Sequence, residues 1–300
     1  MRRETFAAVG ITSALLLSGC AAETQVDSNQ RVSSSQNRAA LPSAIEAELA
    51  ANILQFKTED SSQHPEYGSA VRVALGNKAI ILTAAHMLGG ATKDCSQETL
   101  YASNGDGTTT QYTPTLQSPV PRSSNYEWDN MNRVDAAAII PDVTTGADAL
   151  AITSKEPKVG STLIMANFQA FPDGTSRDVA AYDAARLPAI YSGIVVGYFK
   201  KKLVVATGHG ESYGATSDDT QRSASSGGAA IIDNPTSPDN ARLAGLTIST
   251  LNDTKTAAQI EQMYGYQPPE GTYTVGFVEP ITQSVANRLD HQAEQMPACT

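Results

Sequence analysis

Two neighbouring apolar stretches predict paired strands in the first third of the chain. Residues 68–75 read Gly-Ser-Ala-Val-Arg-Val-Ala-Leu, and residues 79–88 read Ala-Ile-Ile-Leu-Thr-Ala-Ala-His-Met-Leu. Between them lies Gly76-Asn77, a pair of residue types that tolerates the positive φ of a tight hairpin turn. The pattern therefore predicts an antiparallel hairpin, whose second strand runs into a short turn that carries a histidine.

Helical spacing occurs near both ends of the chain. Ile45, Leu49 and Ile53 recur every four residues, and the segment Ser43-Ala44-Ile45-Glu46 has the form of a capping box. We expect a helix of about three turns there, within a lead-in over residues 43–65, and its packing against the strands is favoured over docking to a partner. Close to the C-terminus, Ile281, Val285 and Leu289 form a similar apolar stripe.

Composition favours many short strands and turns over a helical bundle. Aromatic residues make up 6% of the 300-residue chain, which has 22 glycines and 15 prolines. The formal net charge is −10, and no Lys/Arg run is longer than the three lysines at 200–202. An acidic chain of this kind argues against nucleic acid or an anionic lipid surface as the main partner.

The N-terminal segment has the pattern of an export signal. Met1-Arg2-Arg3 is basic, residues 6–17 are apolar, and Leu17-Ser18-Gly19-Cys20 follows. An apolar run of about a dozen residues is typical of a signal peptide, because a membrane-spanning helix needs about 20. The last four residues resemble the lipobox of bacterial lipoproteins, in which the cysteine is lipidated. We therefore expect a lipoprotein signal peptide over residues 1–19, and the alternative is an ordinary signal peptide followed by a chance cysteine.

The resemblance to lipoproteins implies a place in the bacterial cell envelope. Two acyl chains on Cys20 would anchor the protein stably to a membrane, facing the periplasm or the exterior. Residues 20–42 are rich in small polar residues and carry little apolar bulk, so we expect them to form a flexible tether. Loss of residues 1–19 would remove two arginines and one glutamate and change the net charge from −10 to −11.

The number of cysteines is compatible with an oxidising compartment, but it does not determine whether a disulfide forms. The chain has three cysteines, and lipidation of Cys20 would leave Cys95 and Cys299. These two residues could form a disulfide or remain free thiols, and sequence alone leaves both open. The four histidines show no metal-binding spacing, and no glycine-rich phosphate loop is present, so we expect neither a metal site nor a cofactor.

Three short motifs supply the residue types of a hydroxyl-nucleophile hydrolase. They are Thr-Ala-Ala-His ending at His86, Val-Asp-Ala-Ala around Asp135, and Ser-Ser-Gly-Gly around Ser226. A serine hydroxyl needs an imidazole to accept its proton, and a carboxylate behind the imidazole fixes the tautomer. The residues are 49 and 91 positions apart, against about 45 and about 93 in the chymotrypsin order. Each motif alone is more simply explained as a structural histidine, a turn aspartate or a Ser/Gly loop, and only their conjunction predicts a triad.

On these motifs the chain resembles the trypsin-like serine proteases, over roughly residues 66–293. The resemblance implies an all-β fold of two antiparallel six-stranded β-barrels followed by a C-terminal helix at about 279–293. The protease domain would span residues 66–300, with a first barrel at about 66–150 and a second at about 158–278. The triad would lie in the cleft between the barrels.

The chain departs from the family pattern next to the nucleophile. The residue before the nucleophile is usually an aspartate that pairs with a new N-terminal amine, but here it is Ser225, and no matching N-terminal sequence is present. Loss of both partners avoids an unpaired buried charge, so we expect a site that needs no zymogen cleavage. The backbone N–H groups of Ala224 and Ser226 would form the oxyanion hole, although alanine there tolerates a positive φ poorly.

The resemblance also assigns a substrate pocket. Thr220, six residues before the nucleophile, would lie at its base and make it neutral, whereas a shift of one or two residues would place Asp219 or Asp218 there. Ser249 and Thr250 would line the edge along which a peptide adds as a strand. The pocket would be closed by the segment that begins at Gly271.

We therefore expect a membrane-tethered serine endopeptidase acting on protein or peptide substrates, with no indication of an assembly larger than a monomer. His86 would be the general base, Asp135 would orient it, and Ser226 would attack the scissile carbonyl. One alternative is a catalytically inactive relative that acts as a surface binding module, which the residues Ala224 and Ser225 motivate. A third keeps the triad but acts on a non-peptide acyl group.

Overall fold

The fold is built mainly from antiparallel strands in two sheets. The computed structural model describes residues 43–58, 66–88, 96–104, 108–112, 115–116, 134–139, 149–168, 188–213, 226–232 and 241–295. The predicted signal peptide and tether, residues 1–42, lie outside this part of the chain. Within the described ranges, no helix is both long and apolar enough to span a membrane.

The first sheet is open in the part of the chain that the structure describes. Its strands follow the order β5-β4-β1-β2-β3-β7, and β6 pairs with β4. Their bounds are β1 Ile53–Thr58, β2 Glu66–Leu75, β3 Lys78–Thr83, β4 Ser96–Asn104, β5 Thr108–Tyr112, β6 Thr115–Leu116 and β7 Ala137–Ile139. The hairpin predicted from the alternating pattern is β2–β3, and Gly76 takes a positive φ of 62° in its turn.

The second sheet closes into a barrel of six strands. The order is β12-β9-β10-β11-β14-β13, and β12 also pairs with β13, which completes the ring. The bounds are β9 Thr162–Asn167, β10 Ala189–Phe199, β11 Lys202–Tyr213, β12 Ala229–Ile232, β13 Arg242–Thr256 and β14 Thr272–Pro280. The short strand β8 (Ala151–Ile152) adds to β13 in parallel. The prediction of a barrel in the second half of the chain is therefore confirmed, whereas the described residues do not show a closed first barrel.

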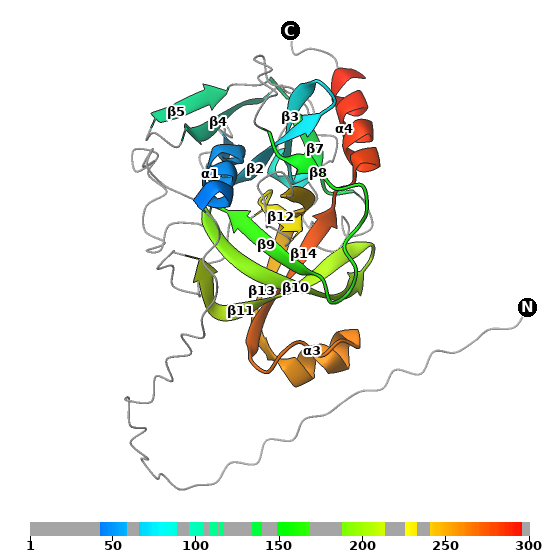
Figure 1. Ribbon diagram of the computed structural model, residues 1–300. Coiled ribbons are helices and arrows are strands. Elements are labelled where there is room, and N and C mark those ends of the chain that lie inside the picture. The colour runs from blue at the N-terminus through cyan, green and yellow to red at the C-terminus, as the bar shows by residue number, and fades with distance from the viewer. Residues whose placement is uncertain are drawn as a thin grey trace, which may run out of the picture. The chain divides into compact units, whose positions relative to one another are not determined.

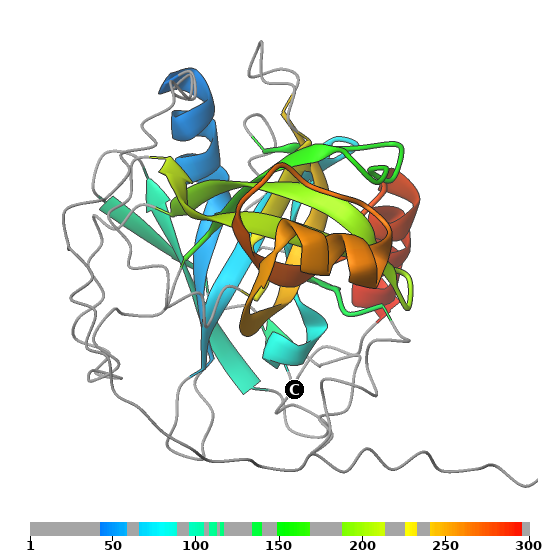
Figure 2. The same ribbon diagram turned by 90° about the horizontal axis from the view of Figure 1, so that it is seen from below.

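Among the described residues, helices lie at three places around the sheets (Figures 1 and 2). They are α1 (Ser43–Asn52), α3 (Ala257–Tyr264) and α4 (Gln283–Gln295), with a short 3-10 helix η1 (Ala85–Leu88) after β3. Figure 2 shows α3 across the end of the barrel that faces the viewer, where it contacts β10 and β13. The helix begins with a capping box between Thr256 and Gln259, and ends at Gly265 in the left-handed conformation.

The N-terminal helix ends one residue earlier than its apolar stripe suggested. Ile45 and Leu49 lie in α1 and are fully buried, but Ile53 is already the first residue of β1. β1 pairs with both β2 and β4, so the segment interpreted as a lead-in contributes a central strand of the first sheet. All three residues of the apolar stripe are nevertheless buried together, because Ile53 packs into the same core cluster as Ile45 and Leu49.

Two clusters of buried side chains join the two sheets. The first contains residues of α1, β1–β3, β9, β12, β13 and α4, among them Ile80 and Leu246, together with Leu150 just before β8. The second joins Leu54 and Ile81 of the first sheet to residues of the barrel such as Val204. A backbone connection follows the same seam: the carbonyl of Leu150 accepts a hydrogen bond from the N–H of Ala74 at 2.8 Å, just before β8 pairs with β13. The two halves are therefore held in register by side chains and by backbone alike.

The C-terminal helix is tied to the first sheet by a surface ion cluster. Lys78 begins β3, and its Nζ atom lies 2.7 Å from Asp290 Oδ2 and 2.7 Å from Glu294 Oε1, both on α4. Hydrogen bonding to Asp290 and to Glu294 raises the pKa of Lys78. The hydrogen bond from Lys78 lowers the pKa of Glu294.

We expect Lys78→Met to lower the free energy of unfolding by a small amount within a defined pH window. The lowered pKa of Glu294 gives stability that is present above its ordinary pKa and lost as the pH falls through the lowered one. The raised pKa of Lys78 gives stability that is present below its ordinary pKa and lost as the pH rises through the raised one. Urea unfolding at neutral, acidic and alkaline pH measures this, with the exposed Lys158→Met as control. A loss that stays constant across the whole pH range would contradict the expectation.

Candidate active site

His86 lies directly after the predicted hairpin. β3 ends at Thr83, and η1 begins two residues later, stabilised by a hydrogen bond from the N–H of Met87 to the carbonyl of Ala84 at 3.0 Å. Ala84 and Ala85 are fully buried, whereas the side chain of His86 is 16% exposed. The buried strand thus anchors the turn, and the imidazole remains within reach of a substrate.

Asp135 contacts His86 through both of its carboxylate oxygens, one at the backbone and one at the imidazole. Oδ1 accepts the backbone N–H of His86 at 3.0 Å, and Oδ2 lies 3.0 Å from His86 Nδ1. Asp135 is 4% exposed and lies two residues before β7. A carboxylate at this position accepts a hydrogen bond from the N–H at Nδ1, so Nε2 is the nitrogen left to act as a base.

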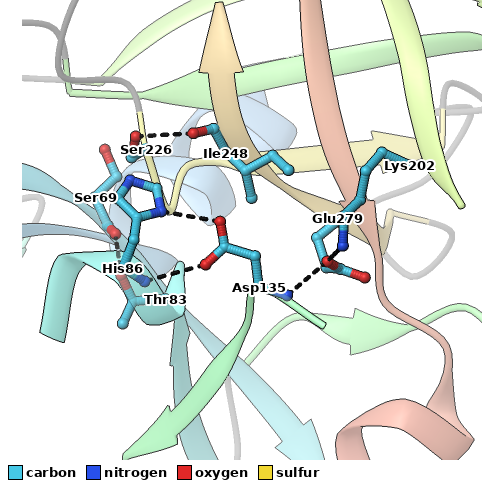
Figure 3. A network of polar contacts seen from close by, with 8 residues as sticks. All are labelled: Ser69, Thr83, His86, Asp135, Lys202, Ser226, Ile248 and Glu279. Atoms are coloured by element: carbon cyan, nitrogen blue, oxygen red, sulfur yellow. Dashed lines mark hydrogen bonds and ion pairs between the residues drawn. The ribbon is translucent and has the colours of Figure 1, made fainter. Parts of the chain in front are cut away.

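Ser226 is placed on the other side of the imidazole. In Figure 3 the ring of His86 lies between Asp135 and Ser226, so the structure brings together the three residues that the motifs indicated. Ser226 lies in the turn before β12, and its Oγ atom donates a hydrogen bond of 3.3 Å to the carbonyl of Ile248 on β13. The arrangement joins one residue from the barrel with two from the first sheet and its connections.

The turn that carries Ser226 is fastened to both sheets by its backbone. The carbonyl of Ser226 accepts the N–H of Ser69 on β2 at 2.7 Å, and the N–H of Gly227 donates to the carbonyl of Thr247 on β13 at 2.6 Å. Thr83 completes the connection, because its Oγ1 atom donates to the carbonyl of Ser69 at 2.8 Å. The turn is therefore bonded directly to β2 and β13. Through Ser69 and Thr83 it is also connected to β3, the strand that leads to His86.

The residue at position 227 must be glycine because the Ser226 turn approaches the backbone of β2 very closely. Its φ is 83°, and a Cβ atom at this position would lie 1.8 Å from the carbonyl oxygen of Ser69. Only glycine combines that backbone conformation with that contact. The first glycine of the Ser-Ser-Gly-Gly motif thus has a steric role.

Ser69 connects the turn to a third segment. Its Oγ atom accepts the backbone N–H of Phe168, directly after β9, at 2.9 Å, and Ser69 is fully buried. Its backbone and side chain therefore bind β2 to both neighbouring parts of the barrel. Sequence reasoning placed Ser69 in a strand and assigned it no role at the site.

The predicted pocket residues are only partly brought together. Ser249 and Thr250 lie on β13 opposite Phe277 and Gly276 of β14. Gly271 instead lies beside α3, where its carbonyl accepts the N–H of Ala257 at 3.3 Å. Five residues at about 3.3 Å each separate it from Gly276, so it lies about 16 Å further along the strand. The described neighbours of Ser249 and Thr250 on β14 are thus Phe277 and Gly276.

Several predicted residues lie outside the described part of the chain. Of the two expected oxyanion-hole donors, Ser226 is described and Ala224 is not. The pocket residue Thr220, the lipidation site Cys20 and the cysteines Cys95 and Cys299 also lie outside it. Within the described ranges, no group of three or more His, Cys, Asp or Glu side chains has the geometry to hold a metal ion.

A buried ion pair adjoins Asp135 and was not predicted. Glu279 at the end of β14 accepts the backbone N–H of Asp135 at 2.7 Å through Oε2, and Lys202 at the start of β11 donates to the same oxygen. The two residues are 5% and 2% exposed. Burial raises the pKa of Glu279, and the charge of Lys202 opposes this rise. No motif marks either residue: Glu279 has no charged neighbour in the sequence, and Lys202 is the last of three consecutive lysines at a hairpin turn.

Comparisons with known proteins find similar solved structures but no similar sequences. No family model matches the chain, and no curated protein matches it. A thermostable serine protease, AL20, from an extremophilic microorganism matches 83% of this chain and 100% of its own, with 13% identity and a TM-score of 0.48. The Rv3671c protease from M. tuberculosis in its active form matches 86% of this chain and 90% of its own, with 13% identity and a TM-score of 0.46.

A third structure is the serine endoprotease from Yersinia pestis. The match covers 84% of this chain and 65% of that chain, with 14% identity and a TM-score of 0.45. Similarity at this level concerns the fold and says nothing about activity.

The class of fold follows from the strands themselves. The chain is mostly β, with a closed six-stranded antiparallel barrel, an open antiparallel sheet packed against it and a C-terminal helix. The site lies where the two sheets meet, with His86 and Asp135 beside the first sheet and Ser226 on the barrel. The predictions of a mostly antiparallel β fold, of a barrel in the second half of the chain and of a helix near the C-terminus are therefore confirmed.

Gly227→Ala tests the close approach, and Gly76→Ala is its matched control. Both glycines have a positive φ, but a Cβ atom at Gly76 meets nothing within 4 Å. We expect Gly76→Ala to lower the free energy of unfolding by about 1 kcal/mol through backbone strain alone. Gly227→Ala should lower it by more than about 4 kcal/mol, because the Ser69 backbone must also move. Urea unfolding measures both, and equal losses would contradict the role given to the contact.

Proposed function

We propose that this protein is a serine endopeptidase. His86 takes the proton of Ser226 as the hydroxyl attacks the scissile carbonyl, and it returns the proton to the leaving amine. Asp135 keeps the basic nitrogen turned toward the serine and stabilises the imidazolium that forms. The proposal rests on one observation: Asp135 contacts both the backbone N–H and the Nδ1 atom of His86, and Ser226 lies on the opposite side of the ring.

We infer that the substrate is an extended peptide that pairs with β13 near Ser249 and Thr250. An extended segment can add to a strand through backbone hydrogen bonds, and the nucleophile turn is itself bonded to β13 through Thr247. Ser225 stands where an activating aspartate is usual, which supports a site that forms without zymogen cleavage. A neutral primary pocket based on Thr220 remains part of the proposal.

The second candidate is a catalytically inactive binding module. The observation that favours it is the hydrogen bond from Ser226 Oγ to the carbonyl of Ile248, which turns the hydroxyl toward the backbone. Rotation about χ1 of the serine redirects its hydroxyl, and hydrogen bonds of a catalytic site often tighten only when substrate binds. Chemical labelling of the serine separates the two candidates.

Ser226→Ala should abolish labelling by a fluorophosphonate probe without unfolding the protein. The probe reacts with a serine only where a base removes its proton, so the wild-type chain should be labelled at Ser226. Asp135→Asn should slow labelling by about 10⁴-fold because it disturbs the imidazole tautomer. The control is Ser161→Ala, a half-buried residue at the end of the turn before β9, which should label as the wild type does.

Gel fluorescence and mass spectrometry of the labelled peptide provide the measurement. Labelling that persists in Ser226→Ala would reject the assigned nucleophile, and a wild-type chain that resists the probe would favour the binding module. A peptide library then separates an endopeptidase from an enzyme that acts on a non-peptide acyl group, because only the former yields cleaved peptides.

We also propose that a lipidated Cys20 tethers the protease to the bacterial cell envelope. The support is the Leu-Ser-Gly-Cys sequence after a short apolar run, followed by a polar segment. Two acyl chains would hold the protein firmly, whereas a chain without them has no comparable anchor.

Cys20→Ser should move the protein from the membrane fraction to the soluble fraction of expressing bacteria. Fractionation and incorporation of a labelled fatty acid measure the two consequences of the change. Cys95→Ser is the matched control and should remain with the membrane. Fatty-acid incorporation into Cys20→Ser at the wild-type level would reject the tether.

A further inference from the structure

Asp135 is held at its backbone as well as at its side chain. Its two carboxylate oxygens are engaged by His86, and its N–H donates to Glu279 Oε2 at 2.7 Å. The neighbouring strand β7 is short: it has three residues, and in the described part of the chain its strand pairing is with β3 over Ala137–Ile139. The position of Asp135 therefore depends on contacts outside the sheet, and Glu279 supplies one of them.

Glu279 can remain charged at this buried position because a lysine lies beside it. Leu203 of β11 pairs with Val278 of β14. Lys202 directly precedes Leu203 and Glu279 directly follows Val278, so the antiparallel register places the two charged residues side by side. The hairpin turn before Lys202 is tight, with positive φ at both Lys200 and Lys201. Burial of one charged partner alone would cost several kcal/mol, whereas the pair compensates both charges.

A single oxygen of Glu279 makes both the contact with Lys202 and the contact with Asp135. Glu279 Oε2 accepts from the ammonium group of Lys202 and from the N–H of Asp135 (Figure 3). A hydrogen bond to a charged acceptor is roughly twice as strong as one between neutral groups. The oxygen is thus shared between β11, β14 and the segment that carries the triad aspartate.

We propose that Lys202 and Glu279 are positioning residues for the catalytic triad. Glu279 fixes the backbone of Asp135, and Lys202 fixes and neutralises Glu279, so that the Asp135 carboxylate stays aligned with His86. This inference rests on the proposed protease function, since without a reacting Ser226 there is no alignment to maintain. A pair that served stability alone would have no effect on the rate of the triad in a folded protein.

Two double variants separate positioning from stability. Lys202→Met with Glu279→Leu replaces the pair by apolar side chains of similar size, a change that folded proteins often tolerate, and it removes the acceptor for Asp135. Lys202→Met with Glu279→Gln also removes both charges but keeps a carbonyl oxygen as acceptor. The two variants therefore differ in the hydrogen bond to Asp135.

The measurement is the rate of Ser226 labelling by a fluorophosphonate over a range of probe concentrations, using the full chain. The Met/Leu variant should lower the maximal labelling rate by about 100-fold, as misplacement of a catalytic group does, and leave the half-saturating probe concentration nearly unchanged. The Met/Gln variant should recover the rate to within about tenfold of the wild type. The surface variant Lys78→Met is the control and should label at the wild-type rate.

The outcomes distinguish this inference from the function it rests on. A wild-type chain that does not label would overturn both. A wild-type chain that labels, together with a Met/Leu variant that labels equally fast, would overturn the positioning role and leave the protease function standing. Equal slowing in the two double variants would also overturn it, because the retained acceptor would then have no effect.

A second readout applies even where the Met/Leu variant fails to fold. The amide proton of Asp135 in ¹⁵N-labelled protein reports its acceptor directly, since a charged acceptor moves the resonance downfield. The Met/Gln variant should shift this resonance upfield relative to the wild type. An unmoved resonance would mean that Glu279 does not hold Asp135, and it would overturn the proposal.

Discussion

The site depends on the close approach of the Ser226 turn to β2. Gly227 brings the backbone of the barrel against the carbonyl of Ser69, and the N–H of Ser69 bonds in turn to the carbonyl of Ser226. Two sheets that met only through side chains could slide by a fraction of an ångström, because apolar contacts are not directional. Backbone hydrogen bonds at the seam have strict geometry, so they fix the serine relative to the strand hairpin that leads to His86.

The three candidate catalytic residues are held by supports of different strength. His86 follows a fully paired hairpin, and Ser226 is bonded to both sheets. Asp135 precedes a strand of only three residues and is held instead by polar contacts. Misalignment of a triad costs rate even where the fold is intact, so the weakest support determines how well the site is preorganised. The proposed role of the buried ion pair beside the aspartate fits this difference in support.

Sequence patterns located the residues of the site but not the contacts that hold them. The sequence predicted the hairpin before His86 from two neighbouring apolar runs. It predicted the barrel in the second half, and singled out His86, Asp135 and Ser226, from three short motifs and their order along the chain. The end of α1 could not be predicted, since Ile53 satisfies the same apolar spacing in a helix or in a strand. Nor could the location of Gly271, which depends on an α3 segment inserted between β13 and β14. The pairs Ser69–Ser226 and Lys202–Glu279 join residues 157 and 77 positions apart, and only the folded register brings them together.

A second carboxylate, that of Glu279, lies close to the candidate triad, and its charge is compensated by Lys202. Glu279 faces the backbone N–H of Asp135, while the Asp135 carboxylate points the other way, toward His86 (Figure 3). Lys202 neutralises Glu279, so the imidazole is influenced mainly by the nearer carboxylate. A neutral acceptor could have bound the same N–H at a smaller desolvation cost, but with a weaker hydrogen bond. A buried ion pair at this point is therefore better explained by the alignment of Asp135 than by stability, because apolar residues of similar volume would stabilise the fold at least as well.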